Sequence, residues 1–207
     1  MVKSKESSWL RVFNFCNFPK SGKVVEIAPG KSNKITKALE LYKFSGKLFL
    51  IEPDKKALNS LVKDCKKILP NSEIIPVPFP LNKINLSKVD AIVSNHPLDD
   101  MLVGKFIKDF DAYYNASPNE IKLTWRRIES NKLKLEKAKE IVFNEWIKLI
   151  EKTQPSKVII SQYESSFFKK HKIKSPDIHG YDILKRIKEK YNSKEIKKRW
   201  LLISNPK

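Results

Sequence analysis

The turn at residues 24–32, VVEIAPGKS, holds residue types that could bind a phosphate or a nucleotide. A short β-branched run ends there at Pro29, and Gly30-Lys31-Ser32 matches the last positions of the phosphate-binding pattern G-x-x-x-x-G-K-[ST]. That pattern needs its first glycine at Val25, and Pro29 lacks the backbone N–H that a phosphate cradle uses. The sequence therefore argues against a nucleoside-triphosphatase loop and leaves a different ligand open for this turn.

Two more polar groups follow strand-like segments further along the chain. Glu52 ends an apolar segment 22 residues after Gly30, and a carboxylate at such a position can accept hydrogen bonds from both hydroxyls of a ribose. Asn95 ends another such segment and is followed by His96 and Pro97. Both groups also have a plain structural interpretation, as a helix start and as a strand exit before a capped helix.

Apolar runs along the chain predict the sheet that would position these groups. The predicted strands are 23–28, 47–52, 73–78, 89–95, 157–162 and 199–204. Strands that are continuously apolar and alternate with helical patterns indicate a parallel sheet covered on both faces. We therefore expect an α/β fold, a doubly wound Rossmann-like sheet, with Asn95 outside the carboxyl ends of the strands, where ligands bind.

A long helical pattern lies between the fourth and fifth predicted strands. It begins at a capping box, Ser117–Glu120, and its apolar stripe includes Trp125 and Trp146, which we expect in the core. If it were unbroken up to the fifth strand, this helix would be roughly 50 Å long, more than a small sheet can cover. We expect either a kink near Ser130-Asn131 or a first part that projects as a lid.

Composition limits the class of protein. The 207 residues and 41% hydrophobic content are enough for one domain over residues 1–207, with residues 1–20 as a helical N-terminal extension. Cys16 and Cys65 lie far apart without metal-ligand spacing, so we expect no metal site and no disulfide, as in a reducing cytoplasm. The sequence has no apolar run that could span a membrane and no signal-peptide core at the N-terminus, so a cytoplasmic protein is expected.

The net charge of +19 is large for a chain of 24.1 kDa. From residue 165 to the end, 13 lysines and arginines stand against 4 acidic residues, so nearly half of the excess charge lies in about a fifth of the chain. Such a field concentrates polyanions near the protein. Nucleic acid, RNA before DNA, is therefore the expected partner, with Lys197, Lys198 and Arg199 as candidate phosphate contacts. The alternative is a solvated, lysine-rich surface.

The order of these segments resembles class I S-adenosylmethionine-dependent methyltransferases over about residues 20–165. Their motif I is an acidic residue before a glycine-rich turn, E/D-x-G-x-G-x-G, and residues 26–32 follow this frame with Ala28 and Ser32 in place of two glycines. The turn is most similar to that of rRNA adenine dimethyltransferases. The resemblance implies S-adenosylmethionine as the cofactor, with Phe79 against its adenine ring. The residues that it assigns to the cofactor are Glu26, Ala28, Pro29, Gly30, Ser32, Glu52, Pro53, Phe79 and Asn95.

Residues 95–98, Asn-His-Pro-Leu, resemble motif IV of the amino-methylating branch, N-x-P followed by an aromatic residue. In that motif the asparagine carbonyl and a backbone carbonyl accept hydrogen bonds from the target amino group, and the aromatic ring stacks on the base. The candidate catalytic residues are therefore Asn95, His96 and Pro97. His96 would be a base or a contact to the base edge. Leu98 lacks the stacking ring, and Tyr163 or Phe167-Phe168 could face the same pocket.

We expect direct methyl transfer to RNA or DNA, in which the protein chiefly positions the two reactants. Two alternatives remain: a methyltransferase of a small molecule or protein, and a non-catalytic nucleic-acid-binding module on a degenerate methyltransferase fold. The altered glycines and Leu98 favour the second alternative. Class I methyltransferases usually end in an antiparallel strand pair, whereas this sequence shows one clear final strand. The seventh strand is therefore expected to be shortened, missing or hidden. The sequence predicts no oligomeric state.

Overall fold

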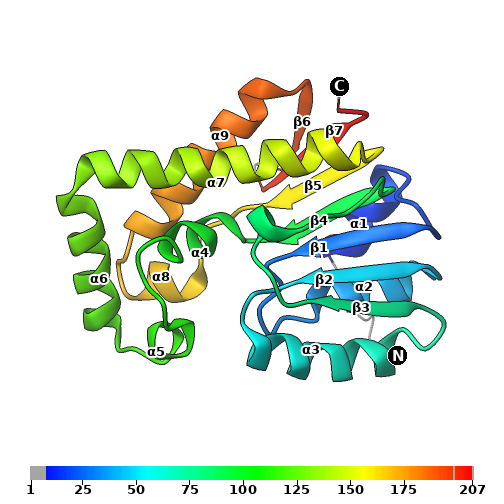
Figure 1. The fold of residues 1–207 in the computed structure, drawn as a ribbon, viewed down its shortest axis with the longest axis horizontal. Helices are drawn as coiled ribbons and strands as arrows, with labels where there is room; N and C mark the ends of the chain where they lie inside the picture. The colour runs from blue at the N-terminus through cyan, green and yellow to red at the C-terminus, as the bar shows by residue number, and fades with distance from the viewer. Residues whose placement is uncertain (1–7, 198, 207) are drawn as a thin grey trace.

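The computed structural model describes residues 8–197 and 199–206, which form a seven-stranded sheet (Figure 1). The strands are β1 Lys23–Ile27, β2 Lys47–Ile51, β3 Glu73–Val77, β4 Ala91–Asn95, β5 Lys157–Ser161, β6 Ser193–Ile196 and β7 Trp200–Ser204. Their order across the sheet is β3-β2-β1-β4-β5-β7-β6. Strands β1 to β5 run parallel, and β7 runs antiparallel to β5 and β6. The doubly wound α/β fold predicted from the sequence is confirmed.

Helices cover both faces of this sheet and also lie beyond the carboxyl ends of its parallel strands. They are α1 Ser8–Phe15, α2 Lys34–Leu41, α3 Lys55–Ile68, α4 Leu98–Val103, α5 Phe110–Tyr114, α6 Pro118–Ser130, α7 Lys132–Thr153, α8 Ser166–Lys170 and α9 Ser175–Lys190, with a 3₁₀ turn, η1, at Leu81–Lys83. Figure 1 shows α4, α5, α6 and α8 beyond the carboxyl ends of the parallel strands. The edge at which the sequence places its candidate site therefore faces a wall of short helices.

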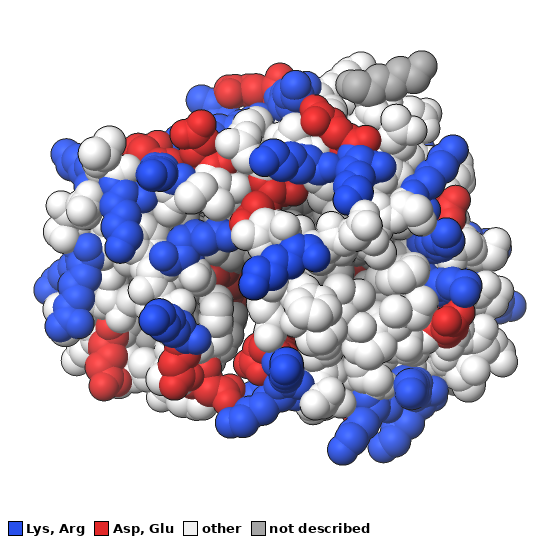
Figure 2. Space-filling model, viewed as in Figure 1, with Lys and Arg blue, Asp and Glu red and all other residues white. Residues whose placement is uncertain are grey.

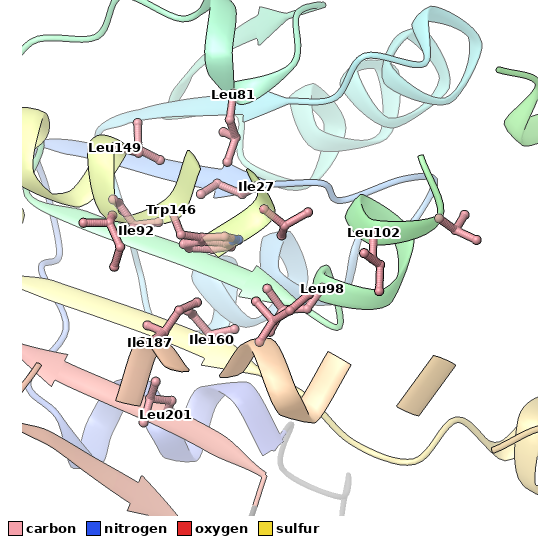
Figure 3. Packing of buried hydrophobic residues seen from close by; sticks show 14 of the residues in the cluster. Ile27, Leu81, Ile92, Leu98, Leu102, Trp146, Leu149, Ile160, Ile187 and Leu201 are labelled. Carbon is pink, nitrogen blue, oxygen red and sulfur yellow. The ribbon is translucent and has the colours of Figure 1, made fainter. Parts of the chain in front are cut away.

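Two apolar clusters hold the helices on the sheet. Residues of α1, α2 and α3, including Trp9, pack on one face, and residues of α4, α6, α7 and α9 pack on the other. Neighbouring strand residues point to opposite faces, so Val24 belongs to the first cluster and Val25 to the second. Figure 3 shows Trp146 of α7 among Ile92 and Leu98 in the second cluster. Helix α1 lies within the predicted N-terminal extension, and residues 1–7 of that extension lie outside the described residues.

The long helical pattern divides into two helices at Asn131. This residue has φ −111° and ψ 80°, outside the helical region, and its side chain accepts a hydrogen bond from the Lys134 backbone N–H at the start of α7. Figure 1 shows α6 turning away from α7 at this point, which confirms the predicted break. Trp125 and Trp146 are 1% and 0% exposed, as expected of core residues. No described helix is long and apolar enough to cross a membrane.

The C-terminal strand pair is present. The predicted final strand is β7, and the expected missing or hidden strand is β6, which has four residues, Ser-Lys-Glu-Ile. Two charged side chains in the middle of β6 are exposed because it is the edge strand. Since β6 has no apolar run, hydrophobic periodicity could not identify it.

Candidate cofactor and substrate site

A cavity of about 530 Å³ lies at the carboxyl ends of β1, β2, β4 and β5. Its walls are the turn after β1, the segment after β2, residues around η1, the residues after β4 and β5, and parts of α4, α5 and α7. Ligand pockets in proteins typically measure about 300–1,000 Å³. The cavity therefore has the size and the position expected of a site for a nucleotide-like ligand in a doubly wound fold.

The turn after β1 exposes its backbone to this cavity. Ala28 and Gly30 have φ of 49° and 58°, a left-handed conformation in which glycine is favoured. A Cβ atom on Gly30 would meet no atom within 4 Å, so its backbone borders open space. Pro29 and Ser32 also line the cavity, and the Ser32 N–H donates to the Pro29 carbonyl at 3.0 Å. The structure thus brings together four of the five turn residues that the sequence assigned to the cofactor.

Glu52 holds the end of β2 against this turn. Its Oε2 accepts a hydrogen bond from the Gly30 N–H at 2.9 Å, and its Oε1 accepts one from the Asp54 N–H at 3.0 Å. Burial raises the pKa of this carboxyl, and the two N–H donors act against that rise. A carboxylate oxygen can accept more than one hydrogen bond, so Glu52 retains acceptors for ligand hydroxyls. Pro53 lines the cavity beside it.

Asn95 lies at the cavity, but its side-chain oxygen already has a partner. Its Oδ1 accepts a hydrogen bond from Trp9 Nε1 at 3.1 Å, and its Nδ2 donates to Tyr163 Oη at 3.4 Å. An indole N–H can only donate, so this contact fixes which way the amide faces. Asn95 therefore presents an N–H group to Tyr163, whereas the motif IV interpretation requires a carbonyl for an incoming amino group.

His96 has both ring nitrogens engaged. Its Nδ1 lies 3.0 Å from Asp99 Oδ1, and its Nε2 lies 2.6 Å from the Tyr163 carbonyl oxygen and 3.6 Å from Asp177 Oδ1. Burial alone would lower the pKa of His96, but its hydrogen bonds to Asp177 and Asp99 outweigh burial and raise the pKa to about 11. Such a raised pKa favours the imidazolium form, and the role of His96 as a base or as a contact to the base edge stays a prediction.

Three assigned residues do not line the cavity. Glu26 is 1% exposed within β1, on the same side of the strand as Val24, which packs towards α1, α2 and α3. Pro97 is buried at the start of α4. Phe79 is 52% exposed, and the cavity wall next to it is formed by Pro80 and Leu81. Each of these side chains points elsewhere because of its place in the strand, cap or loop.

Of the candidate nucleic-acid residues, Arg199 contacts the cavity wall through Tyr163 without lining the cavity itself. The Arg199 guanidinium lies 4.1 Å from the ring centre of Tyr163 and 4.7 Å from that of Trp200, and Tyr163 lines the cavity. Lys197 is exposed, and Lys198 lies outside the described residues. Of the aromatic residues expected near the pocket, Tyr163 lines it, and neither Phe167 nor Phe168 does.

Residues of α4, α5 and α7 form a wall that the sequence did not indicate. The wall includes Asp100, Lys105, Phe110, Asp111, Tyr114 and Glu145. Lys105 Nζ lies 2.7 Å from Glu145 Oε1, and burial together with Asp99 raises the pKa of Asp100 to about 8. The one feature of the sequence that belongs to this wall is the pair Asp99 and Asp100, which we interpreted from the sequence as a cap of the following helix. Burial of two adjacent acids was not visible without the fold.

Comparison with known proteins supports the fold. A scan against protein-family models finds no match for this sequence, and a search of curated proteins finds no similar one. Among solved structures, the methyltransferase domain of bacterial CtHen1-CN is 12% identical, with 96% of this chain and 98% of that chain covered and a TM-score of 0.51. A candidate S-adenosyl-L-methionine-dependent methyltransferase from Methanococcus maripaludis is 15% identical, with 96% and 85% covered and a TM-score of 0.50.

A candidate RNA methyltransferase from Pyrococcus horikoshii is 10% identical over 80% of this chain, with a TM-score of 0.45, and this chain spans 62% of its length. At such identities the likeness concerns the fold. The chain has the Rossmann-like fold of S-adenosylmethionine-dependent methyltransferases. The likeness to the rRNA adenine dimethyltransferase branch stays a prediction.

Proposed function

We propose that this protein is an S-adenosylmethionine-dependent methyltransferase. The observation that carries the proposal is the cavity between the Gly30 turn and Glu52, at the carboxyl ends of the strands of a methyltransferase fold. The open backbone at Gly30 suits close approach of the methionine portion of the cofactor, and the buried Glu52 carboxylate suits the ribose hydroxyls. When bound, the cofactor supplies an electrophilic methyl group, and the chain positions the nucleophile against it.

The adenine portion has a different expected contact from the one that the sequence suggested. Pro80 and Leu81, which line the cavity after β3, are the apolar residues available to a base ring in place of Phe79. Asn95 and Tyr163 lie where the residues after β4 and β5 meet, and we assign them to the nucleophile's side of the cavity.

We further propose nucleic acid, RNA before DNA, as the substrate. The net charge of +19 supports a polyanionic substrate because it raises the local concentration of such molecules near the chain. The guanidinium of Arg199 lies over Tyr163, which lines the cavity, and is available to contact a phosphate next to the methylated group. These features favour a nucleic acid over the alternatives of a protein or a small molecule.

Two measurements test the proposal. Calorimetric titration of the purified protein with S-adenosylmethionine should show one site per chain, and absence of binding would refute the methyltransferase function. Radiolabelled cofactor should then be incubated with the protein and total RNA, total protein or a small-molecule extract in parallel. Label in RNA supports the proposed substrate, and label confined to protein or small molecules would contradict it. Tight binding with no transfer anywhere would favour the non-catalytic module.

A further inference from the structure

Tyr163 lines the cavity with a hydrogen-bond donor and several positive charges around it. It follows the end of β5 by two positions, is half-buried and lines the cavity. Its Oη receives the N–H of Asn95 at 3.4 Å. The Arg199 guanidinium lies 4.1 Å from its ring centre, and the His96 ring centre lies 4.7 Å from it. Two cations and an amide donor from two separate segments, residues 95–96 and Arg199, thus converge on this phenol.

The fold fixes which groups donate or carry positive charge toward the Tyr163 phenol. Asn95 can offer only N–H groups to the phenol because its oxygen is held by Trp9. Lys34, at the start of α2, lines the same cavity and adds a third positive charge facing Tyr163. Each of these groups stabilises a negative charge on the phenol oxygen.

The carboxylates near Tyr163 are engaged by other partners. Asp99 and Asp177 contact the His96 imidazolium, and Glu164 pairs with Lys169 at 3.5 Å. Within the part of the chain that the structure describes, neither Lys34 nor Arg199 forms an ion pair with a carboxylate. Burial acts to raise the pKa of Tyr163, but Asn95, Lys34 and His96 outweigh it and lower that pKa from its ordinary value.

We propose that Tyr163 is the general base of the methyl transfer, an inference that rests on the proposed function. In this step the nucleophile forms a bond to the methyl carbon while the sulfonium–methyl bond breaks, and the sulfur keeps the electron pair. The proton of the nucleophile moves to Tyr163 Oη. The products are the methylated substrate, S-adenosylhomocysteine and neutral Tyr163, which returns its proton to water.

This arrangement also indicates the class of nucleophile. A base is useful when the attacking atom carries a proton that opposes attack, as in a hydroxyl or an ammonium group. An exocyclic amino group held by two carbonyls is served instead by acceptors, and Asn95 does not offer its carbonyl here. Because the proposed substrate is a nucleic acid, we expect transfer to a hydroxyl group.

An optical titration tests the phenol without any knowledge of the substrate. The chain has six tyrosines, and the pKa values of Tyr42, Tyr113, Tyr114, Tyr181 and Tyr191 are all raised, chiefly by burial. The tyrosinate absorbance that appears at the lowest pH should therefore belong to Tyr163. It should vanish in Tyr163→Phe, persist in the control Tyr181→Phe, and move to higher pH in Lys34→Met. A lowest step that persists in Tyr163→Phe would overturn the proposal.

Turnover then decides whether the phenol acts in catalysis. With labelled cofactor and the substrate fraction that accepts label, Tyr163→Phe should lower kcat by ~100-fold or more while the Kd for S-adenosylmethionine stays unchanged. The kcat/KM of the wild-type protein should rise with pH through the same pKa as the optical step, and Lys34→Met should shift both together. Loss of cofactor affinity in place of turnover, or an unshifted pH profile in Lys34→Met, would overturn the base assignment. The proposed function itself would fail separately, if wild-type protein did not bind the cofactor.

Discussion

At the scale of single residues, two buried carboxyl groups on neighbouring strands have different surroundings. Glu52, at the end of β2, is 8% exposed and receives two backbone N–H donors. Glu26, in the middle of β1, is 1% exposed, and its Oε2 has no hydrogen-bond partner. Because a buried charge needs donors, Glu52 is suited to remain a carboxylate, whereas burial raises the pKa of Glu26 to about 8. Only Glu52 is therefore a candidate acceptor for the ligand.

Replacing Glu52 with alanine should weaken cofactor binding. Glu52→Ala removes the charged acceptor for two hydroxyls, each bond to a charged group contributing about 1.5–3 kcal/mol, so the Kd should rise by about two to four orders of magnitude. Calorimetry with S-adenosylmethionine measures this change. Glu73→Ala is the control, because Glu73 is an exposed carboxylate at the amino end of β3. Equal affinities in both variants would remove Glu52 from the cofactor site.

Replacing Glu26 with glutamine should change how stability depends on pH. Burial raises the pKa of Glu26 to about 8 in the folded protein, from an ordinary value of 4.5 that applies to the unfolded chain. Between these two pH values the folded state keeps the proton on Glu26, whereas the unfolded state has lost it. The contribution of Glu26 to the free energy of unfolding should therefore be fully present below pH 4.5 and should fall by about 1.4 kcal/mol per pH unit as the pH rises to about 8. In Glu26→Gln this contribution to the slope should be absent, and the variant should be more stable than the wild type at pH 7.

Urea unfolding from pH 5 to pH 8 checks this expectation. The free energies of unfolding of wild type and Glu26→Gln should converge toward pH 5 and separate toward pH 8. Glu73→Gln, the same chemical change at an exposed carboxylate, should give a curve parallel to that of the wild type. Parallel curves for Glu26→Gln would mean that the buried carboxyl is already ionised in the folded state.

The ligand-facing backbone was predictable at this scale, and the side-chain partners were not. Gly30 and Glu52 lie close to the ends of two apolar runs. The ends of these runs therefore predicted that both residues lie at the carboxyl ends of the strands. The hydrogen bond between Trp9 and Asn95 joins residues 86 positions apart, and the contacts of His96 come from α4 and α9. Such partners depend on packing across elements, which a local pattern does not contain.

At the scale of elements, helix α5 closes one side of the cavity. It spans only five residues, and Asp111 on it lies 3.1 Å from Lys56 Nζ at the start of α3 and 3.8 Å from Lys31 Nζ in the turn after β1. Both segments contribute to the side of the cavity that we propose for the cofactor. The two ion pairs therefore connect α5 to the part of the site that the cofactor would occupy.

Removing the charge of Asp111 should loosen this connection. In Asp111→Asn the Kd for S-adenosylmethionine should rise by no more than about fivefold, because exposed ion pairs contribute little. The difference from wild type should shrink at high salt, which screens such pairs. Glu73→Gln breaks a comparable exposed pair, that with Lys47 at 2.7 Å, at the amino ends of the strands, and should leave the Kd unchanged. A salt-independent loss in Asp111→Asn would show that α5 contributes by something other than these ion pairs.

Element prediction succeeded where hydrophobic patterns are long and failed where they are short. The break at Asn131 followed from the length of the pattern and from a residue type that prefers caps. Helix α5 and strand β6 have five and four residues, too few to show a period, and their positions depend on neighbours. Because α5 forms part of the cavity wall, this missed helix contributes site residues that the sequence did not predict, as α4 and α7 also do.

At the scale of the whole molecule, positive charge is spread rather than gathered. Figure 2 shows Lys and Arg side chains distributed over the visible face, with Asp and Glu side chains between them. A net charge of +19 on such a surface gives long-range attraction to polyanions, whereas a defined phosphate path needs particular residues. Long-range attraction depends on the total charge alone, so it changes equally wherever a charge is reversed. A defined phosphate path changes only when one of its own residues is reversed.

Charge reversal at two places on the chain should separate these contributions. Reversing Lys197, Lys198 and Arg199 to Glu removes charge from the segment whose Arg199 contacts the cavity wall. Reversing Lys63, Lys66 and Lys67 removes the same charge from exposed positions in the second half of α3. Because helices in this fold run opposite to the parallel strands they connect, the second half of α3 lies away from the carboxyl edge. Binding of a single-stranded RNA oligonucleotide should weaken with salt, with a slope of about −0.7 per neutralised phosphate. The reversal beside the cavity should lower affinity more and flatten the slope by up to about 2. Equal losses in both variants would assign RNA binding to net charge alone, and absence of binding at low salt would contradict a nucleic-acid substrate.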